Sequence, residues 1–431
     1  MLIYAKFKNL LSFDGDGVEF SMVASETIRK NASHVVQVSD ARALKDALVI
    51  GPNASGKSNI VKAFHLLKQM VGEGNCGRAR GKQSLPCAKG EKIKSAPSTW
   101  DIVYSWGDMI FQYVLTTNGI KVHKESLSIL GKGDKETEIF VRNGQRVKYG
   151  AHFKASDYRS IKVFPYELLL GKVLKEGVFK EDANVQNGHF LDAALKGLDA
   201  IHINPFESGT DNRVMLPKGV DPVEFAEFLE EFFRSLDVGV DGIQVEKKEC
   251  RYDYMPTGLD PDRWLLCNWG GWLMAFQGPV EKAHVASFRF RCHGVEMTLD
   301  QMGNGVKRIL PIAEACFLMK LTSEETWVFD DFGDGLHPHL TKHLVKVIQN
   351  LMSKKKHQVI LTTHDTSLLD DYLWRSDEVW FCEKRLSGAT DLFALCEFKG
   401  HEGRWDWQQD YLVGRFEAIP RLGSILLGEE D

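Results

Sequence analysis

Residues 51–58 read Gly-Pro-Asn-Ala-Ser-Gly-Lys-Ser, a complete phosphate-binding P-loop. An apolar β-like run at 47–50 precedes it, and residues 58–70 follow with apolar side chains at helical spacing. Backbone N–H groups of such a loop hold a polyphosphate. Lys57 would reach the β and γ phosphates, and Ser58 would bind Mg²⁺. The sequence therefore predicts ATP or GTP binding, with contacts from Asn53, Ala54, Ser55, Gly56, Lys57, Ser58 and Asn59.

A pair of acids supplies the second part of a nucleotide site. A P-loop enzyme needs a carboxylate to hold Mg²⁺ and a group to orient the attacking water. The apolar run 327–329 ends in Asp330 and Asp331. We expect Asp330 to be the Walker B acid that shares Mg²⁺ with Ser58, and Asp331 to polarise the water. A structural turn is the alternative role for Asp331.

A histidine follows the next buried-strand pattern, at residues 358–363. Ligands of open α/β sheets bind at the carboxyl ends of parallel strands. We therefore expect His364 to contact the γ-phosphate. The predicted catalytic residues are Lys57, Asp331 and His364.

Two glycines open an apolar helix upstream of the Walker B strand. Gly303 and Gly305 flank Asn304, and apolar residues continue over 309–321. Free backbone N–H groups at a helix start form an anion site. In a single-copy P-loop site this segment has no partner, whereas in a head-to-tail dimer it would face the γ-phosphate held by the other subunit.

These groups need a sheet and helices to position them. Residues 1–22 predict a β-hairpin, and residues 100–149 predict an antiparallel meander with a turn at Asn143-Gly144. Residues 165–235 are mainly helical in pattern. After residue 300, helix and strand patterns alternate as in parallel-sheet α/β structure.

Composition narrows the class of protein. The 431 residues are 43% hydrophobic and 26% charged with a net charge of −5, which argues against a strongly basic nucleic-acid binder. The Lys/Arg-rich loop 78–94 leaves local DNA binding open. The sequence contains no run of 18 apolar residues, so it does not predict a membrane span. Eight scattered cysteines without a Cys-x-x-Cys pair predict reduced thiols and a cytoplasmic protein.

Two smaller groups of residues allow alternatives. Trp264, Trp269 and Trp272 could stack on a partner, and burial is the competing interpretation. His337, His339 and His343 could bind a metal, but no nearby cysteine or acid completes a tetrahedral set.

The order of the motifs GPNASGKS, MGNGVKRIL, VFDDFGDGLHPHL and ILTTHD resembles that of the ABC-class ATPases of the SMC/RecF/OLD group. More narrowly, the chain is similar to stand-alone AAA-type ATPases of abortive-infection and anti-phage systems, such as the Septu and PARIS ATPases. The resemblance implies an α/β, ABC-type P-loop ATPase head built on a mixed sheet, with an antiparallel β-meander lobe and a helical insertion.

On this basis we expect five segments. They are the N-terminal β lobe with the P-loop (1–71), a basic loop with an antiparallel β lobe (72–160), a helical insertion (161–240), the second half of the ATPase head (241–400) and a tail (401–431).

The resemblance also assigns roles. Gly303, Asn304 and Gly305 occupy the signature motif, which acts in trans across an ATP-sandwiched dimer. His364 is the switch histidine. The implied function is ATP hydrolysis with Mg²⁺ in a homodimer or higher assembly of dimers, which senses infection and controls a toxin or nuclease. Only 67 residues follow His364, so we expect that effector to be a separate protein encoded nearby.

One departure from the family pattern matters. The position after the Walker B acid is usually glutamate, but here it is Asp331. The shorter carboxylate predicts slow hydrolysis. The alternative function is that of a RecF/SMC-like ATPase that binds DNA in repair; a transporter subunit, a kinase or a GTPase fits the motifs less well.

Overall fold

The computed structural model describes residues 1–77, 96–131, 135–150, 162–176, 185–204, 213–250, 255–279, 282–398 and 406–420. The chain forms two compact units. The first comprises residues 1–203, 324–334 and 356–431, and the second comprises residues 204–323 and 335–355. The predicted basic loop 78–94 lies outside the described residues.

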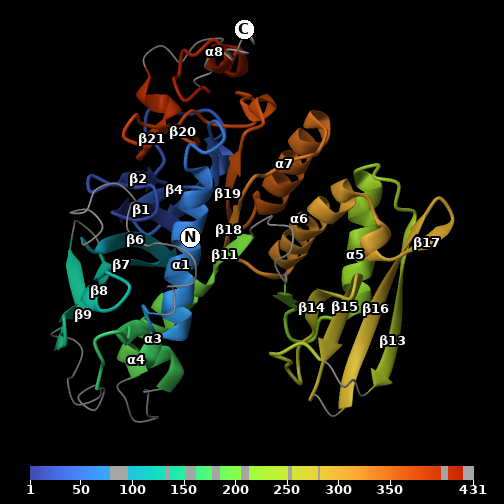
Figure 1. The fold of residues 1–431 in the computed structure, drawn as a ribbon, viewed down its shortest axis with the longest axis horizontal. Helices are drawn as coiled ribbons and strands as arrows, with labels where there is room; N and C mark the ends of the chain where they lie inside the picture. The colour runs from blue at the N-terminus through green and yellow to red at the C-terminus, as the bar shows by residue number, and fades with distance from the viewer. Residues whose placement is uncertain are drawn as a thin grey trace, which may run out of the picture. The chain divides into compact units, whose positions relative to one another are not determined.

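A six-stranded sheet carries the nucleotide motifs in the first unit (Figure 1). Its central strands β18, β19, β5 and β20 are parallel neighbours in that order, and β21 joins the edge antiparallel to β20. Every residue of the P-loop strand β5 is buried, as expected for a strand covered on both faces. The strands are β11 (Ile201–Asn204), β18 (Thr326–Phe329), β19 (Gln358–Thr363), β5 (Asp46–Ile50), β20 (Val379–Lys384) and β21 (Thr390–Ala394).

A seven-stranded antiparallel sheet completes the strands of this unit's core. The predicted N-terminal hairpin is its β1–β2 edge, and the predicted meander forms the rest, with the Asn143-Gly144 turn joining β9 to β10. In spatial order the strands are β10 (Arg146–Tyr149), β9 (Glu136–Asn143), β8 (Val122–Leu130), β7 (Met109–Thr117), β6 (Ser98–Trp106), β1 (Leu2–Lys8) and β2 (Val18–Ser21).

Helix α1 (Lys57–Glu73) links the two sheets of the first unit. Its apolar face, including Ile60, Phe64 and Leu67, belongs to one continuous core with residues of both sheets. The Trp100 indole donates to the Ala63 carbonyl at 2.9 Å, which ties α1 to the antiparallel sheet. Short elements complete the unit: η1 (Ala32–His34), β3 (Val35–Val38), β4 (Ala41–Leu44), α3 (Leu169–Glu176), α4 (Val185–Asp199), η5 (Thr366–Leu368), η6 (Leu395–Glu397) and α8 (Trp407–Leu412).

The second unit packs helices on an antiparallel sheet. Helix α5 (Pro222–Ser235) begins at a capping box formed by Asp221 and Glu224, as its Asp-Pro start predicted. Phe225 of α5 contacts Phe288 of the sheet and Phe317 of α6 (Asn304–Leu321). The remaining elements are β12 (Arg213–Met215), β13 (Gly242–Cys250), β14 (Leu265–Trp269), β15 (Trp272–Gln277), β16 (Ala283–Cys292), β17 (Val295–Met297), η4 (Leu299–Gln301) and α7 (Pro338–Met352).

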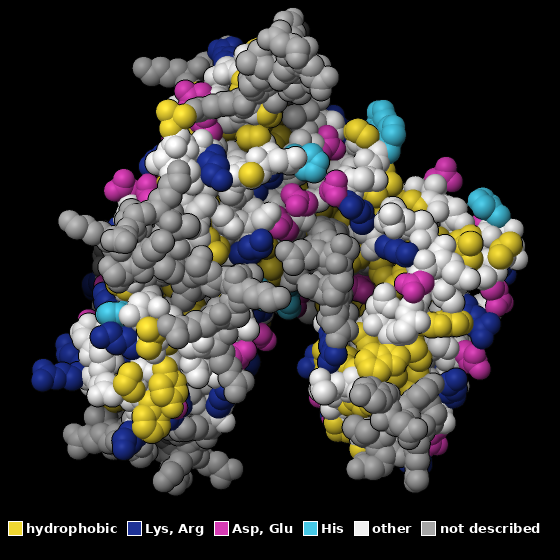
Figure 2. Space-filling model, viewed as in Figure 1, with side chains coloured by type: hydrophobic (Ala, Val, Ile, Leu, Met, Phe, Trp, Pro, Cys, Tyr) yellow, Lys and Arg dark blue, Asp and Glu magenta, His cyan; other side chains and the backbone are white. Residues whose placement is uncertain are grey.

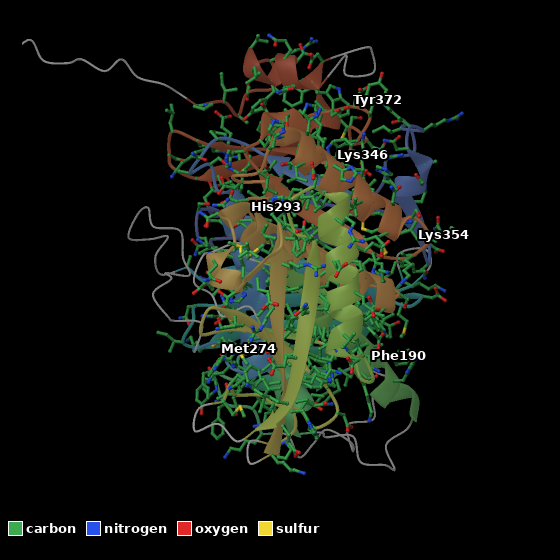
Figure 3. All side chains as sticks on the ribbon, turned by 90° about the vertical axis from the view of Figure 1, so that its right-hand side faces the viewer. Phe190, Met274, His293, Lys346, Lys354 and Tyr372 are labelled. Atoms are coloured by element: carbon green, nitrogen blue, oxygen red, sulfur yellow. The ribbon has the colours of Figure 1, made fainter. Side chains whose placement is uncertain are left out.

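Helix α7 is amphipathic. Leu344, Val345 and Ile348 are buried, while Lys346 is exposed and projects outward with Lys354 beyond the helix end (Figure 3). In the described part of the chain, no helix has the length and apolar character needed to cross a membrane.

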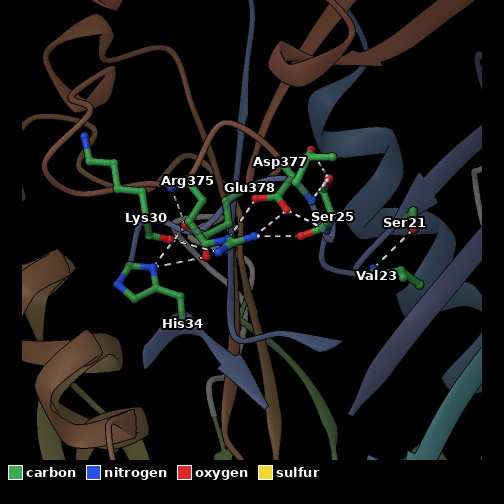
Figure 4. Close-up of polar contacts among 9 residues, drawn as sticks. Ser21, Val23, Ser25, Lys30, His34, Arg375, Asp377 and Glu378 are labelled. Atoms are coloured by element: carbon green, nitrogen blue, oxygen red, sulfur yellow. Dashed lines mark hydrogen bonds and ion pairs between the residues drawn. The ribbon is translucent and has the colours of Figure 1, made fainter. Parts of the chain in front are cut away.

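A buried ionic network lies at the amino ends of β5 and β20 (Figure 4). Arg375, which is 1% exposed, pairs with Asp377 at 2.8 Å and donates to the Lys30 carbonyl at 2.8 Å. Nearby, His34 Nδ1 lies 3.0 Å from Glu378 and 3.5 Å from Asp46. Burial lowers the pKa of His34 and raises the pKa of Glu378 well above its ordinary value. These groups anchor the N-terminal segment far from the P-loop end of the strands.

The predicted fold class, a mixed α/β head with an antiparallel lobe, is confirmed. The helical pattern over 165–235 needs a correction, because β11 and β12 interrupt it. These strands have four and three residues, too short to show a period of two beside helices. Of the three tryptophans that could either stack on a partner or be buried, Trp264 is buried, while Trp269 and Trp272 are half-buried. The five-segment division stays a prediction.

Candidate functional site

Three parallel strands end together at the predicted site. Ile50 of β5 pairs with Thr363 of β19, and Leu361 of β19 pairs with Phe329 of β18. The P-loop, the acids after β18 and His364 therefore leave the same edge of the sheet. Strands are about 4.8 Å apart, so the P-loop strand and the Walker B strand are roughly 10 Å apart across β19. Nucleotide-sized ligands bind at this edge of open parallel sheets.

The P-loop closes over its own lysine. Lys57 is the first residue of α1, and its ammonium group donates to the carbonyl oxygens of Gly51 at 2.8 Å and Pro52 at 2.9 Å. Asn53 and Ala54 are exposed, whereas Ser55 is buried and Ser58 is half-buried. The backbone is left-handed at Ala54 and Gly56, which curls the loop at the start of α1. The helix thus presents free N–H groups and a cation at one point.

Close packing behind the loop explains two of its glycines. A Cβ on Gly51 would lie 2.2 Å from the Cys382 carbonyl oxygen, and one on Gly56 would lie 2.0 Å from Thr390 Oγ1. That Thr390 hydroxyl donates to the Ser55 carbonyl at 2.8 Å and lies 2.6 Å from Ser12 Oγ. Strand β21 and the first loop of the chain therefore brace the phosphate loop from behind.

The side chain of Asn59 has a partner within the protein. Its amide donates to Ser12 Oγ at 2.6 Å, so in this conformation it belongs to the bracing network. The nucleotide contacts of Asn59 and of the other P-loop residues named from the sequence stay predictions.

The two acids after β18 are held by the neighbouring strand. Asp330 Oδ1 accepts from Thr362 Oγ1 at 2.5 Å, and the Asp331 N–H donates to the same hydroxyl at 3.0 Å. Asp331 has a φ of 48°, in the left-handed region. The chain rejoins β19 at Phe332, whose N–H donates to the Thr362 carbonyl at 2.7 Å.

His364 lies beyond β19, half-exposed, with Nε2 3.9 Å from Asp334 Oδ1. The next residue, Asp365, caps the short helix η5 by accepting from the Ser367 N–H at 2.9 Å. The imidazole is thus presented to solvent at the sheet edge from a fixed backbone.

Electrostatics couple these groups. Burial lowers the pKa of Lys57, although the Asp331 and Asp330 carboxylates oppose the shift. Burial also raises the pKa of Asp331, and the neighbouring Asp330 adds to that rise while Lys57 and His364 oppose it. The side chains of Lys57, Asp330, Asp331 and His364 therefore form one interacting set. A raised carboxyl pKa is typical of a residue placed to act as a base.

The donor chemistry fits Mg²⁺. Ser58 and Asp330 offer only oxygen ligands, which Mg²⁺ prefers. One oxygen of Asp330 is already oriented by Thr362, which leaves Oδ2 for a cation. When bound, the ion supplies positive charge to the β and γ phosphates.

The predicted signature segment lies in the second unit. Gly303 caps α6 and Asn304 is its first residue; both are exposed. Gly303 has a φ of −61°, and a Cβ placed there would meet no atom within 4 Å among the described residues. A Cβ on Gly305 would contact only Leu336, at 3.8 Å. Packing within the unit therefore leaves both glycine positions free to take a side chain.

Charge at the surface is mixed. On the face shown in Figure 2, basic and acidic side chains of the described residues are interspersed. This pattern of the described residues agrees with the small net charge of −5.

Comparison with known proteins finds a family model that is similar to part of the chain. Residues 190–370 match a family model described as "AAA domain, putative AbiEii toxin, Type IV TA system". The chain thus carries a segment similar to AAA domains. That segment contains Asp330, His364 and the signature glycines but begins after the P-loop. No curated protein matches the chain.

Among solved structures, the chain is similar to SMC heads. One is a SmcHead bound to the C-winged helix domain of ScpA, at 13% identity over 91% of this chain and 97% of that chain, with a TM-score of 0.45. Another is an SMC head domain from Thermotoga maritima, at 12% identity over 91% and 98%, with a TM-score of 0.35. A third is a Smc head with an extended coiled coil bound to the C-terminal domain of ScpA, derived from Pyrococcus furiosus, at 12% identity over 91% and 96%, with a TM-score of 0.41.

Sequence reasoning missed the residues that support the site. Ser12, Thr362 and Thr390 contact the P-loop or the acids through side-chain hydroxyls. Thr362 lies two residues before His364, near the carboxyl end of β19. This position close to the predicted site was a signal that sequence reasoning could have used. Ser12 and Thr390 are 378 residues apart, and only the fold brings them together.

Proposed function

We propose that this protein is a Mg²⁺-dependent ATPase whose ATP-bound state is a closed homodimer, and that this switch controls a separate effector in anti-phage defence. The convergence of the P-loop, Asp330, Asp331 and His364 at one sheet edge carries the proposal. Motif order alone is compatible with many P-loop proteins, whereas this set brings a phosphate loop, a candidate Mg²⁺ ligand and a candidate base together within one copy of the chain.

Each residue then has a defined role. Lys57 would leave the Gly51 and Pro52 carbonyls and bind the β and γ phosphates, while the α1 N–H groups hold the phosphate oxygens. Ser58 and Asp330 would hold Mg²⁺. Asp331 would orient the attacking water and take its proton, and His364 would contact the γ-phosphate.

The second copy enters through the signature segment. The start of α6 is exposed, and its two glycines are not required by packing within the unit. Without side chains at the two glycines, the backbone N–H groups at the start of α6 are accessible to a phosphate held by another molecule. We therefore infer that Gly303, Asn304 and Gly305 complete the nucleotide site of a partner copy. Higher assemblies of such dimers belong to the same proposal.

The defence role rests on the similarity of residues 190–370 to a family named for toxin–antitoxin systems. An ATPase that opens and closes slowly suits a sensor better than a motor. In this proposal the protein acts in the cytoplasm and holds or releases a toxin or nuclease encoded beside it.

Nucleotide-dependent assembly tests the proposal. Asp331→Ala should retain ATP and shift from monomer to dimer in light scattering when Mg²⁺ and ATP are added. Lys57→Ala should neither hydrolyse ATP nor assemble. A Lys57→Ala variant with the wild-type hydrolysis rate would overturn the proposed function.

A further inference from the structure

One buried hydroxyl contacts both acids of the candidate site. Thr362 is 0% exposed and lies on β19, the strand between the Walker B strand and the P-loop strand. Its Oγ1 donates to Asp330 Oδ1 at 2.5 Å and accepts the Asp331 N–H at 3.0 Å. A threonine hydroxyl has one proton and can accept in return, so a single group satisfies both contacts.

The first contact fixes the rotation of the Asp330 side chain. Oδ1 is bound to Thr362, so Oδ2 is the carboxylate oxygen left for a cation. A hydrogen bond to an ionised carboxylate is stronger than one between neutral groups. Groups that orient a metal ligand in this way commonly change metal affinity by about 10- to 100-fold when they are removed.

The second contact fixes the backbone at Asp331. A non-glycine residue with φ of 48° is unfavourable unless its surroundings hold it there. The Asp331 N–H points at the Thr362 hydroxyl, and the Phe332 N–H donates to the Thr362 carbonyl at 2.7 Å. The left-handed turn sets the direction in which the Asp331 side chain leaves the strand.

We propose that Thr362 is a positioning residue that sets the geometry of both site carboxylates, the one expected to bind Mg²⁺ and the one expected to orient water. This inference rests on the proposed ATPase function. It assigns Thr362 no contact with nucleotide or metal. The adjacent Thr363 makes different contacts, because its hydroxyl donates to the Phe332 carbonyl at 2.8 Å and accepts the Asp365 N–H at 3.1 Å.

Thr363 therefore provides a matched control. Both threonines are at most 1% exposed, are neighbours on β19 and make two hydrogen bonds through Oγ1. Replacing either by valine keeps the β-branched shape and removes a buried hydroxyl. Only Thr362→Val removes contacts to the acids, and Thr362→Ser restores a hydroxyl in their reach.

The experiment measures Mg²⁺ dependence apart from turnover. Binding of a fluorescent ATP analogue is titrated with Mg²⁺ for wild type, Thr362→Val, Thr362→Ser and Thr363→Val, and hydrolysis is measured in parallel. Thr362→Val should bind the analogue without Mg²⁺ as wild type does, yet need about 10- to 100-fold more Mg²⁺ for half-maximal enhancement. Its kcat should fall more than its KM rises. Thr362→Ser should recover most of both losses, and Thr363→Val should leave the Mg²⁺ midpoint unchanged.

Four results would overturn the inference. If Thr362→Val has the same midpoint in the Mg²⁺ titration as wild type, the inference is wrong and the proposed function is unaffected. Equal shifts of the Mg²⁺ midpoint in both valine variants would show that losing any buried hydroxyl on β19 has this effect. No recovery in Thr362→Ser would show that the hydroxyl of Thr362 is not what positions the acids. If wild type binds no nucleotide with Mg²⁺ and behaves like Lys57→Ala, the proposed function itself fails, and this inference fails with it.

Discussion

Replacing Glu314 by glutamine should make this protein more stable at alkaline pH. Glu314 lies ten residues after the start of α6, the helix that begins at the predicted signature segment, and it is only 7% exposed. Burial raises the pKa of its carboxyl from the ordinary 4.5 to about 8. The folded protein thus holds a proton that the unfolded chain releases at lower pH.

The sign and size of the effect follow from that difference. The stability contributed by the bound proton is complete below about pH 4.5 and is lost as pH rises to about 8, where the folded carboxyl ionises. One pKa unit corresponds to about 1.4 kcal/mol. Between pH 6 and pH 9 the wild type should therefore lose on the order of 3 kcal/mol of unfolding free energy through this residue. Glutamine carries no ionisable proton, so Glu314→Gln should not show this loss.

Thermal unfolding at pH 6 and pH 9 measures the difference. The melting temperature of Glu314→Gln should exceed that of wild type at both pH values, because the loss begins near pH 4.5. The difference should be larger at pH 9 than at pH 6 by roughly 3 °C, since an unfolding entropy of about 2.1 cal/mol/K per residue converts about 3 kcal/mol into that shift. Glu227→Gln, which changes an exposed acid on neighbouring α5, is the control and should follow wild type at both pH values. Parallel pH curves for Glu314→Gln and wild type would refute the account of Glu314.

Further predictions concern the site and its supports. Gly56→Ala should abolish nucleotide binding in a fluorescence titration, because its Cβ would lie 2.0 Å from Thr390 Oγ1 at a φ of 119°; binding within twofold of wild type would contradict this packing. Asp331→Glu should hydrolyse ATP faster in a phosphate-release assay if the short carboxylate limits the rate, and an unchanged rate would count against that reason. The raised pKa of Asp331 should move the acid limb of the wild-type kcat profile above the range of an ordinary carboxyl, since the base must be ionised; a limb near pH 4 would exclude Asp331 as the base. Arg375→Met should cost about 3–5 kcal/mol in urea unfolding by leaving Asp377 buried and unpaired, and a loss below about 1 kcal/mol would show that the pair is dispensable.

The strands and motifs that carry the site could be predicted because their signals are local. The P-loop sits between an apolar run and a helical period, and the run 358–363 matches β19 residue for residue. The Asn143-Gly144 turn and the Asp221-Pro222 helix start also lie where their chemistry requires. Such features depend on residues within a few positions of one another.

The supports of the site could not be predicted because they depend on long-range packing. The hydroxyls of Ser12 and Thr390 meet only when β21 folds against the first loop of the chain. The strand β11 has four residues and no visible period, yet it joins the six-stranded sheet. The left-handed turn at Asp331 requires a donor–acceptor pair on a strand more than 30 residues away. A local pattern does not show which distant residues make these contacts.

The central claim is that two copies of the chain complete each nucleotide site. Mixing two inactive variants tests it most directly. Lys57→Ala removes the phosphate lysine. Gly305→Glu places a carboxylate toward the γ-phosphate of a partner, while an acid in the first turn of α6 leaves the helix itself stable.

In a mixed dimer, one site combines an intact P-loop with an intact signature segment. The account predicts that each variant alone hydrolyses no ATP, that Gly305→Ala stays active, and that an equal mixture of Lys57→Ala and Gly305→Glu regains about a quarter of the wild-type rate. Activity in Gly305→Glu alone, or no recovery in the mixture when the mixed dimer is shown to form, would contradict a site shared between subunits.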